Sequence, residues 1–266
     1  MATRISQLLN QSLPTLRYEP TAKRVRANLG GQPVLDTTRA LLLWEPRRIV
    51  PIYAVPEADV LAELAESRAE VAGAPEEAQV LTPDDAFALH TAAGTAMDVR
   101  VPGHTLEAAA FRLADPDLPG IVLLDFRAFD WLEEDQPILA HPRDPFHRID
   151  IVPSSRHVRV EFEGMHLADS AHPVVLFETH LPPRYYLPRA DVAWDALLAT
   201  ARTSQCPYKG TANYWALASG GREVAWSYPD SLPESAAIAG LVAFYNERTD
   251  VIVDGHRLAR PDSPFR

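Results

Sequence analysis

The second half of the chain repeats a pattern of the first half, and this repeat constrains the fold more than any other feature. The stretch LDTTRALLLWE at 35–45 aligns with ADSAHPVVLFE at 168–178, which places Glu45 and Glu178 133 residues apart. Further pairs follow in the same order with small changes of offset. They are Pro20 with Pro153, Gly31 with Gly164, Asp36 with Asp169, Tyr53 with Tyr186, Pro56 with Pro188, Gly94 with Gly210, and LAHPRDPF at 139–146 with LARPDSPF at 258–265. Ordered matches of this kind are typical of a tandem duplication, so we expect two domains of one fold, at 1–148 and 149–266.

The composition is that of a soluble globular protein and argues against several classes of function. Of the 266 residues, 47% are hydrophobic and 23% are charged. The formal net charge of −11 opposes binding to nucleic acid and to anionic lipid, since both need a basic surface. The sequence holds neither a signal peptide nor a run near the ~20 apolar residues of a membrane helix. We therefore expect a cytoplasmic protein with no nucleic-acid or membrane partner.

The cysteine and histidine content argues against a metal or a cofactor. Cys206 is the only cysteine, which leaves no internal disulfide and no cysteine-rich zinc site. The nine histidines include no HExxH or comparable spacing. The glycine pairs at 30–31 and 220–221 match neither a P-loop nor a dinucleotide fingerprint. The sequence therefore predicts no metal and no cofactor.

Within each copy, the residue pattern predicts mostly antiparallel β structure with one main helix. Residues 157–164 alternate apolar and polar side chains, which is typical of a half-buried strand. Gly220–Gly221 and Asp254–Gly255 predict two hairpin turns. The stretch VAWDALLATARTS at 192–204 follows Asp191, a potential capping residue, so we expect the helix of the second copy there. The predicted fold class is mainly β (α+β), with two compact antiparallel domains.

Four blocks of the second copy resemble the domain-of-unknown-function 427 family, which is sometimes labelled nucleotidyltransferase-like. They are ADSAHPVVLFETHLPPRYYLPRADV at 168–192, CPYKGTANYW at 206–215, VAWSYP at 224–229 and IAGLVAFYNERTDVIVDG at 238–255. The first copy resembles the family more weakly and reads as a degenerate copy.

The resemblance implies a β-tent domain, a topology shared with methionine sulfoxide reductase B and the thalidomide-binding domain of cereblon. This chain lacks the paired Cys-x-x-Cys zinc motifs of several such relatives, and it has no Gly-Ser followed by an Asp pair to support nucleotidyl transfer. Because the family has no agreed activity, the resemblance implies a fold and a site position rather than a chemistry.

The stretch TSQCPYKGTANYW at 203–215 contains both candidate catalytic residues. Cys206 is a candidate nucleophile because Lys209 would favour its thiolate, although the end of a preceding helix would oppose this. Its alternative role is that of a small buried hydrophobe. Lys209 is a candidate base or Schiff-base lysine, and its alternative is a solvated loop residue. At an offset of 116 the first copy has His90 and Ala93 instead, which indicates that only the second copy keeps the site.

Aromatic residues gather in the second copy and predict a ligand site there. Trp226 and Tyr228 share one face of a strand, where the first copy has Phe111 and Leu113. Indole and phenol groups need polar partners that a purely apolar core does not, although larger core residues are the alternative. The predicted ligand-binding residues are Arg184, Tyr185, Tyr186, Tyr208, Tyr214, Trp226, Tyr228 and Glu178, of which Glu178 occurs in both copies and has a structural alternative.

These observations predict an unidentified small molecule bound in an aromatic-lined pocket of the second domain, with Lys209 and Arg184 as anchors for an anionic or carbonyl group. They leave open whether a reaction is catalysed. One alternative is a protein–protein interaction module, which would have an exposed apolar patch rather than an enclosed cavity. The other alternative is a Cys206-dependent reductase or transferase, by analogy of fold.

Overall fold

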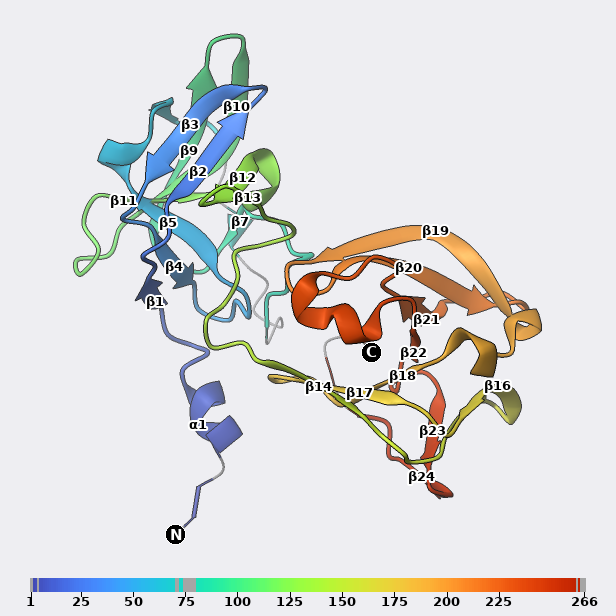
Figure 1. The fold of residues 1–266 in the computed structure, drawn as a ribbon. Coiled ribbons are helices and arrows are strands. Elements are labelled where there is room, and N and C mark those ends of the chain that lie inside the picture. Colours follow the sequence, from blue (N-terminus) through green and yellow to red (C-terminus); the bar gives the residue numbers. More distant parts are fainter. Residues whose placement is uncertain (1, 4, 70–71, 74–79, 262, 264–266) are drawn as a thin grey trace. The chain divides into compact units, whose positions relative to one another are not determined.

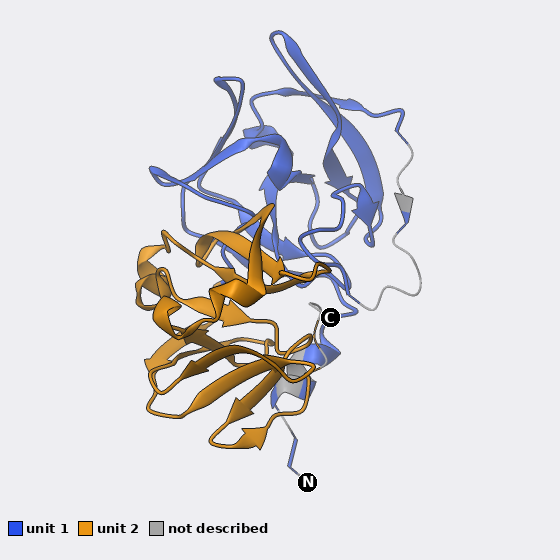
Figure 2. Ribbon diagram, turned by 90° about the vertical axis from the view of Figure 1, so that its right-hand side faces the viewer, with its two compact units in different colours: residues 1–144 blue, residues 145–266 orange. Residues whose placement is uncertain are grey.

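The chain forms two compact units, residues 1–144 and residues 145–266, where the sequence predicted a boundary at 148–149 (Figure 2). The computed structural model describes residues 2–3, 5–69, 72–73, 80–261 and 263. The last part of the repeated stretch LARPDSPF, at 262 and 264–265, therefore lies outside the described residues. Each unit contains a seven-stranded sheet and a four-stranded sheet (Figure 1). The predicted mainly β, antiparallel fold is confirmed.

Unit 1 begins with a short helix and continues almost entirely in strands. Its seven-stranded sheet has the order β1 (Arg17–Pro20), β4 (Leu41–Trp44), β5 (Ile52–Pro56), β11 (Ile121–Leu124), β10 (His104–Leu113), β9 (Gly94–Val101) and β6 (Glu63–Glu66). Its four-stranded sheet has the order β13 (Gln136–Pro137), β12 (Asp130–Glu133), β2 (Val25–Leu29) and β3 (Gln32–Thr37). The remaining elements are α1 (Ile5–Gln11), the 3-10 turns η1 (Glu57–Asp59) and η2 (Phe126–Ala128), and the parallel pair β7 (Ala72–Gly73) and β8 (Leu89–His90).

Unit 2 has the same two kinds of sheet. Its seven-stranded sheet has the order β14 (Ile149–Pro153), β17 (Val174–Glu178), β18 (Arg184–Leu187), β22 (Val242–Phe244), β21 (Glu223–Ser227), β20 (Gly210–Leu217) and β19 (Leu197–Cys206). Its four-stranded sheet has the order β16 (Met165–Ser170), β15 (Val158–Phe162), β23 (Asp250–Val253) and β24 (His256–Arg257). The remaining elements are the 3-10 turns η3 (Arg189–Asp191), η4 (Trp194–Ala196) and η5 (Pro233–Ile238).

The sheets of the two units follow the chain in the same order, strand for strand. Their registers correct one part of the sequence alignment. Leu42 pairs with Tyr53 in unit 1, and Val175 pairs with Tyr185 in unit 2. Because Leu42 and Val175 occupy equivalent places, Tyr53 corresponds to Tyr185 rather than to Tyr186 as the sequence alignment had it. The change of offset thus falls in the loop between the two strands.

The helix predicted at 192–204 is wrong. Residues 194–196 form the 3-10 turn η4, and residues 197–206 form the strand β19. Asp191 ends the turn η3 instead of capping a helix. The ladder that β19 makes with β20, from Leu197 opposite Leu217 to Cys206 opposite Gly210, satisfies backbone groups that a helix would otherwise have bonded internally. No α-helix occurs among the described residues of unit 2, so the expected main helix per copy is also wrong.

The predicted hairpin turns are present, and each uses backbone conformations that favour glycine. Gly220 and Gly221 have φ angles of 94° and 105° between β20 and β21. Asp254 and Gly255 have φ angles of 51° and 80° between β23 and β24. Two successive residues with positive φ match the twist of the flanking strands, which is why such turns connect tight hairpins.

Each unit buries a cluster of apolar residues between its two sheets and a second cluster on the opposite face of the seven-stranded sheet. In unit 2 the first cluster includes Val158, Val160, Leu187, Ala225 and Val253. The second cluster lies on the face that points away from the four-stranded sheet, because it takes the alternate residues of the same strands. This outer face carries the candidate site.

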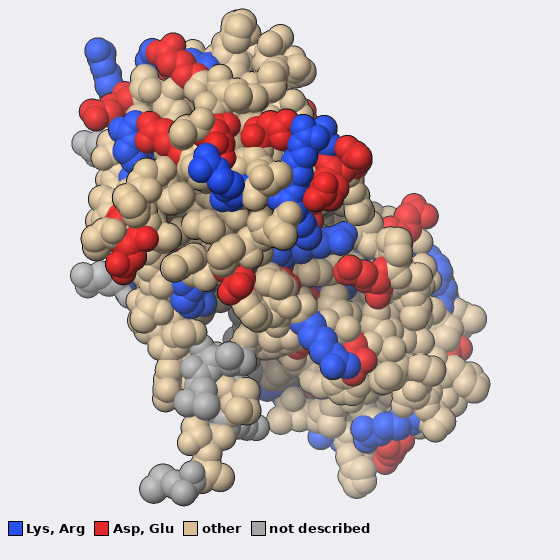
Figure 3. All heavy atoms as spheres, turned by 60° about the vertical axis from the view of Figure 1, so that its left-hand side comes forward, with Lys and Arg blue, Asp and Glu red and all other residues tan. Residues whose placement is uncertain are grey.

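The surface carries charges of both signs. On the face drawn in Figure 3, basic and acidic side chains are interspersed rather than gathered by sign. Partly exposed ion pairs include Arg39 with Asp59 and Arg112 with Glu57. No helix among the described residues is long and apolar enough to cross a membrane.

Close packing at Gly94 generates a prediction about stability. A Cβ atom at Gly94 would overlap the carbonyl oxygen of Arg112 and the ring of Phe111. We expect Gly94→Ala to destabilise the protein by about 1–3 kcal/mol, the usual cost of overpacking. Gly73→Ala is the control, because a Cβ atom there has no described neighbour within 4 Å. Urea unfolding checks both variants, and equal stabilities would contradict the packing at Gly94.

Candidate functional site

The outer face of the seven-stranded sheet of unit 2 brings together most of the predicted ligand-binding residues. Alternation along the strands puts Tyr186 of β18, Tyr214 of β20 and Trp226 of β21 on this face. Tyr228, just beyond β21, and Tyr245, just beyond β22, join them, and η5 adds Ile238. We call the five aromatic residues Tyr186, Tyr214, Trp226, Tyr228 and Tyr245 the aromatic face.

The rings of the aromatic face contact one another in defined geometries. Trp226 lies edge-on to Tyr186 with 6.2 Å between ring centroids, and its indole Nε1 donates a 3.1 Å hydrogen bond to the Tyr186 hydroxyl oxygen. The centroids of Trp226 and Tyr245 are 4.6 Å apart. The Tyr214 hydroxyl lies 2.5 Å from the Ser204 hydroxyl oxygen. Trp226 therefore links the rings of the neighbouring strands.

A buried carboxylate with two nitrogen partners lies at one end of the aromatic face. The Lys209 Nζ is 2.6 Å and 2.5 Å from the two carboxylate oxygens of Glu178, and the His147 Nε2 is 2.9 Å from one of them. Burial alone would raise the pKa of Glu178, but the Lys209 charge and the hydrogen bonds from His147 and Lys209 overcome it and lower this pKa to about 2. Glu178 is thus ionised at neutral pH, and Lys209 is fully engaged as its counter-ion.

A second buried ion pair lies beside Trp226. The two terminal nitrogens of Arg184 donate to the two oxygens of Glu247, each at 2.8 Å, and the guanidinium carbon is 5.4 Å from the centroid of the Trp226 ring. Ser263 also contacts the Glu247 carboxylate. Burial alone would raise the pKa of Glu247, but the hydrogen bonds from Arg184 and Ser263 reverse this and hold it below its usual value. Arg184 is therefore committed to a carboxylate of its own chain.

Cys206 is a half-buried residue at the end of β19, opposite Gly210, and not at a helix end as predicted. Burial raises the pKa of the Cys206 thiol, and this effect outweighs the opposing influence of the Lys209 charge. The nearby Glu178 charge raises it further. The thiol is accordingly protonated at neutral pH, which disfavours the role of nucleophile.

Two predicted residues lie apart from the aromatic face. Tyr185 points to the opposite side of β18 and packs against the cluster between the two sheets. Tyr208 lies in the turn between β19 and β20, and its ring stacks on His147 at 4.7 Å between centroids. The structure therefore groups Tyr208 with His147 of the Glu178 ion cluster and places Tyr185 on the opposite face of the sheet.

Unit 1 has a buried carboxylate at the equivalent position but satisfies it differently. Glu45 accepts hydrogen bonds from the backbone N–H groups of Thr91 and Ala92, each at 3.0 Å. The His90 Nδ1 lies 3.0 Å and the Arg48 Nε 3.3 Å from the other carboxylate oxygen. Unit 1 thus surrounds this carboxylate with Arg48, three residues along the chain, and with a distant loop at residues 90–92.

The registers also correct which residues correspond to Cys206 and Lys209. Thr95 pairs with Arg112 in unit 1, and Asn213 pairs with Ser227 in unit 2. These pairs give an offset of 118 between the two units, where the sequence alignment used 116. Lys209 therefore corresponds to Thr91 and not to Ala93. The donor loop therefore reaches the same carboxylate in both units.

The outer faces of the two seven-stranded sheets differ sharply in chemistry. In unit 1 this face is built mainly from aliphatic side chains, with the rings of Phe111 and Phe87 and the His90 imidazole stacked on Phe111. Its buried residues are Leu43, Ile52, Ala54, Phe111, Leu113, Leu118, Ile121 and Leu123. In unit 2 the same face carries four phenols and an indole. Among the described residues, tyrosine and tryptophan rings line this face in unit 2 and not in unit 1.

Three residues of the site were not predicted from the sequence. His147 lies near the expected domain boundary, and Glu247 and Tyr245 lie in the block IAGLVAFYNERTDVIVDG. The only sequence signal for Glu247 was its place in a block that resembles the family. Nothing in the local pattern linked Glu247 to Arg184, which precedes it by 63 residues.

A comparison with known families finds a match in the second unit. Residues 150–255 match the family model described as a domain of unknown function (DUF427), which covers most of unit 2 and all of the aromatic face. A search of the curated proteins found no match. The match agrees with the resemblance drawn from the sequence, and it carries no activity with it.

The buried Glu178–Lys209 pair generates a prediction. We expect Glu178→Gln to destabilise the protein by about 3–5 kcal/mol, because it leaves the Lys209 ammonium buried without its counter-ion. Asp150→Asn on the adjacent strand is the control, since Asp150 is half exposed and its pair with Arg148 contributes little. Chemical unfolding at pH 7 compares the two variants.

The same pair predicts how this difference depends on pH. The pKa of Glu178 is about 2 in the folded protein against an ordinary 4.5, so its stabilising effect is full above about pH 4.5. The effect is lost as the pH falls from there towards 2. The stability advantage of the wild type over Glu178→Gln should therefore shrink over this range, and an advantage independent of pH would contradict the ion pair.

The environment of Cys206 predicts slow alkylation. At pH 7 we expect iodoacetamide to modify the native protein at least about tenfold more slowly than the urea-unfolded protein, because the buried thiol is protonated. Mass spectrometry over time measures both rates. A native rate equal to the unfolded rate would show an activated thiol and would restore Cys206 as a nucleophile.

Proposed function

We propose that the aromatic face of unit 2 binds a small, planar, uncharged molecule. The observation that carries the proposal is the contrast between the two units, whose sheets share one strand order while only unit 2 lines its outer face with phenols and an indole. A face that served packing alone is satisfied by the aliphatic residues of unit 1. Phenol and indole rings add stacking surfaces and hydrogen-bonding groups, which ligand sites use.

Hydrogen-bonding capacity that the protein does not use supports the proposal. The Tyr228 side chain is 6% exposed. Its hydroxyl has no hydrogen-bond partner among the described residues. The Tyr186 hydroxyl accepts from Trp226, and its own proton has no acceptor within the described part of the chain. Burial raises the pKa of both phenols, so both remain protonated donors at neutral pH. A ligand with a carbonyl or ring-nitrogen acceptor would use them.

The charges of the site favour an uncharged ligand. Lys209 is matched by Glu178 and Arg184 by Glu247, so neither cation is available to anchor a carboxylate or a phosphate. Drawing either cation to an anionic ligand would leave a buried glutamate without its partner, which is costly. The paired Lys209 and the protonated Cys206 also disfavour covalent catalysis, so the proposed activity is binding.

The interaction-module alternative has one observation in its favour. Phe177 on β17 and Val152 on the neighbouring β14 are 45% and 40% exposed. The two residues form a small apolar patch on the side of the sheet opposite to the aromatic face. We rank this alternative second because the patch is small for a protein interface.

Three probes of one shape test the proposed function. Benzamide is uncharged, benzoate is its anionic counterpart and benzamidine is its cationic counterpart at neutral pH. We expect benzamide to raise the melting temperature of the wild type and the two charged probes to have no effect. Tyr228→Phe should weaken benzamide binding about two- to tenfold through loss of one hydrogen bond.

Tyr185→Phe is the matched control, because Tyr185 lies on the opposite face of the same sheet and should not affect binding. Preferential binding of benzoate would contradict the uncharged class. If no compound from a wider library of small metabolites shifts the melting temperature either, the binding function itself fails.

A further inference from the structure

An exposed arginine of unit 2 has no carboxylate partner among the described residues. Arg189 opens the turn η3, and its guanidinium carbon lies 4.2 Å from the centre of the Trp194 ring and 5.7 Å from that of Trp215. Asp191 and Asp195, its nearest acids along the chain, form no ion pair with it. The charge of this arginine is therefore in contact with aromatic rings and not with an acid.

The strand registers identify the equivalent place in unit 1. In each unit, three residues pair in a row across three neighbouring strands. The rows are Val55, Val122 and Arg112 in unit 1, and Leu187, Val242 and Ser227 in unit 2. Arg112 therefore corresponds to Ser227. Glu57 and Arg189 each follow the first residue of their row by two positions and open a 3-10 turn, so these two residues correspond as well.

Unit 1 has an ion pair at this place, and unit 2 does not. Arg112 donates to the two carboxylate oxygens of Glu57 at 2.8 Å and 2.6 Å. Unit 2 has Arg189 in the place of the glutamate and Ser227 in the place of the arginine. The buried Ser227 hydroxyl is uncharged, and it has no hydrogen-bond partner among the described residues. Unit 2 thus retains one charge here, and its sign is opposite to that of the glutamate.

A carboxamide and two indoles lie on the same surface as this arginine. Asn213 pairs with Ser227 across the strands, and Trp215 follows it by two residues, so both side chains lie on the face opposite to the aromatic face. Asn213 is exposed, and its carboxamide has two N–H groups to donate. The Trp194 Nε1 donates to the Arg189 carbonyl at 2.8 Å, which holds the indole against the guanidinium.

We infer that this surface of unit 2 binds a phosphate group. The guanidinium of Arg189 presents several N–H donors in one plane, which match phosphate oxygens, and its contact with Trp194 restrains it. A phosphate has further acceptor oxygens for the Asn213 carboxamide. A carboxylate would use the guanidinium alone, and an exposed pair of that kind contributes little. The site lies on the opposite side of the sheet from the aromatic face and is independent of it.

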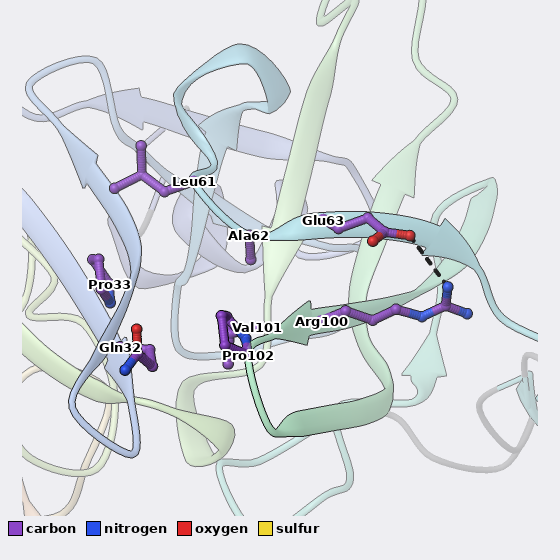
Figure 4. A pocket seen from close by; sticks show the side chains of 8 residues that line it. All are labelled: Gln32, Pro33, Leu61, Ala62, Glu63, Arg100, Val101 and Pro102. Carbon is purple, nitrogen blue, oxygen red and sulfur yellow. Dashed lines mark hydrogen bonds and ion pairs between the residues drawn. The ribbon is translucent and has the colours of Figure 1, made fainter.

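Other exposed arginines are already matched by acids of the chain. At one end of the surface groove of unit 1, Arg100 pairs with Glu63 at 3.2 Å (Figure 4). In unit 2, Arg148 pairs with Asp150 at 3.2 Å. A phosphate at either place would have to displace a carboxylate, whereas Arg189 has none to displace. We therefore expect Arg189 to bind phosphate in preference to these two arginines.

The test uses the full chain and inorganic phosphate, with phenyl phosphate as its organic counterpart and sodium chloride at matched ionic strength as the control. We expect phosphate to give saturable shifts of the NMR signals of the Trp194 and Trp215 indole N–H groups and of the Asn213 carboxamide, and chloride to give none. Tighter binding of phenyl phosphate would indicate an organic phosphate that also contacts the indoles, and equal or weaker binding would indicate free phosphate. The absence of saturable shifts with both would overturn the site.

Variants at exposed positions complete the test. Arg189→Gln should weaken phosphate binding at least about tenfold, because it removes a charged donor. Asn213→Asp places an acid beside the guanidinium, as Glu57 lies beside Arg112 in unit 1, and should abolish binding. Arg148→Gln is the matched control with the same change of charge, and it should bind as the wild type does. Unchanged binding in Arg189→Gln would overturn the inference, and so would an equal loss in Arg148→Gln.

Discussion

A buried carboxylate at the end of the second strand of each seven-stranded sheet is the constraint on which the rest of the structure depends. Glu45 and Glu178 lose their hydration there, so each unit must return charge or hydrogen bonds to that point. Unit 1 supplies two backbone N–H groups, an arginine and a histidine. Unit 2 supplies a lysine and a histidine. Both units therefore need partners for a buried carboxylate, and they differ in which groups provide them.

The choice of counter-ion shapes the face next to the carboxylate. In unit 2 the ammonium of Lys209 comes from the turn that follows β19, and the thiol of Cys206 and the phenols of Tyr186 and Tyr228 lie close enough to feel the Glu178 charge. In unit 1 the carboxylate partner His90 stacks on Phe111 of the same face, and the other buried residues of this face are aliphatic. The phenol and indole groups of the outer face therefore occur in the unit whose buried carboxylate is paired with a lysine. The Lys209–Glu178 and Arg184–Glu247 pairs each have no net charge. The polar groups that this face offers are therefore hydroxyl donors.

The two units also differ just before the outermost strand of the seven-stranded sheet. Unit 2 has the turn η4 before β19, whereas β6 of unit 1 begins at Glu63 without such a turn. The two units thus share one strand order and differ in a short turn and in the side chains that line the outer face.

Local signals in the sequence determined the mainly β class, the hairpin turns at Gly220–Gly221 and Asp254–Gly255, and the gathering of aromatic residues in the second half. These features depend on neighbouring residues, through side-chain alternation and the backbone freedom of glycine, so the sequence contains them. Tertiary structure decided that residues 197–206 form a strand, because the ladder with β20 outweighs a weak helical spacing. It also decided that Tyr185 faces the inner core and that Lys209 and Arg184 are already paired. Those outcomes depend on partners such as Glu178 and Glu247, 31 and 63 residues away along the chain, and only the folded backbone brings such groups within reach of each other.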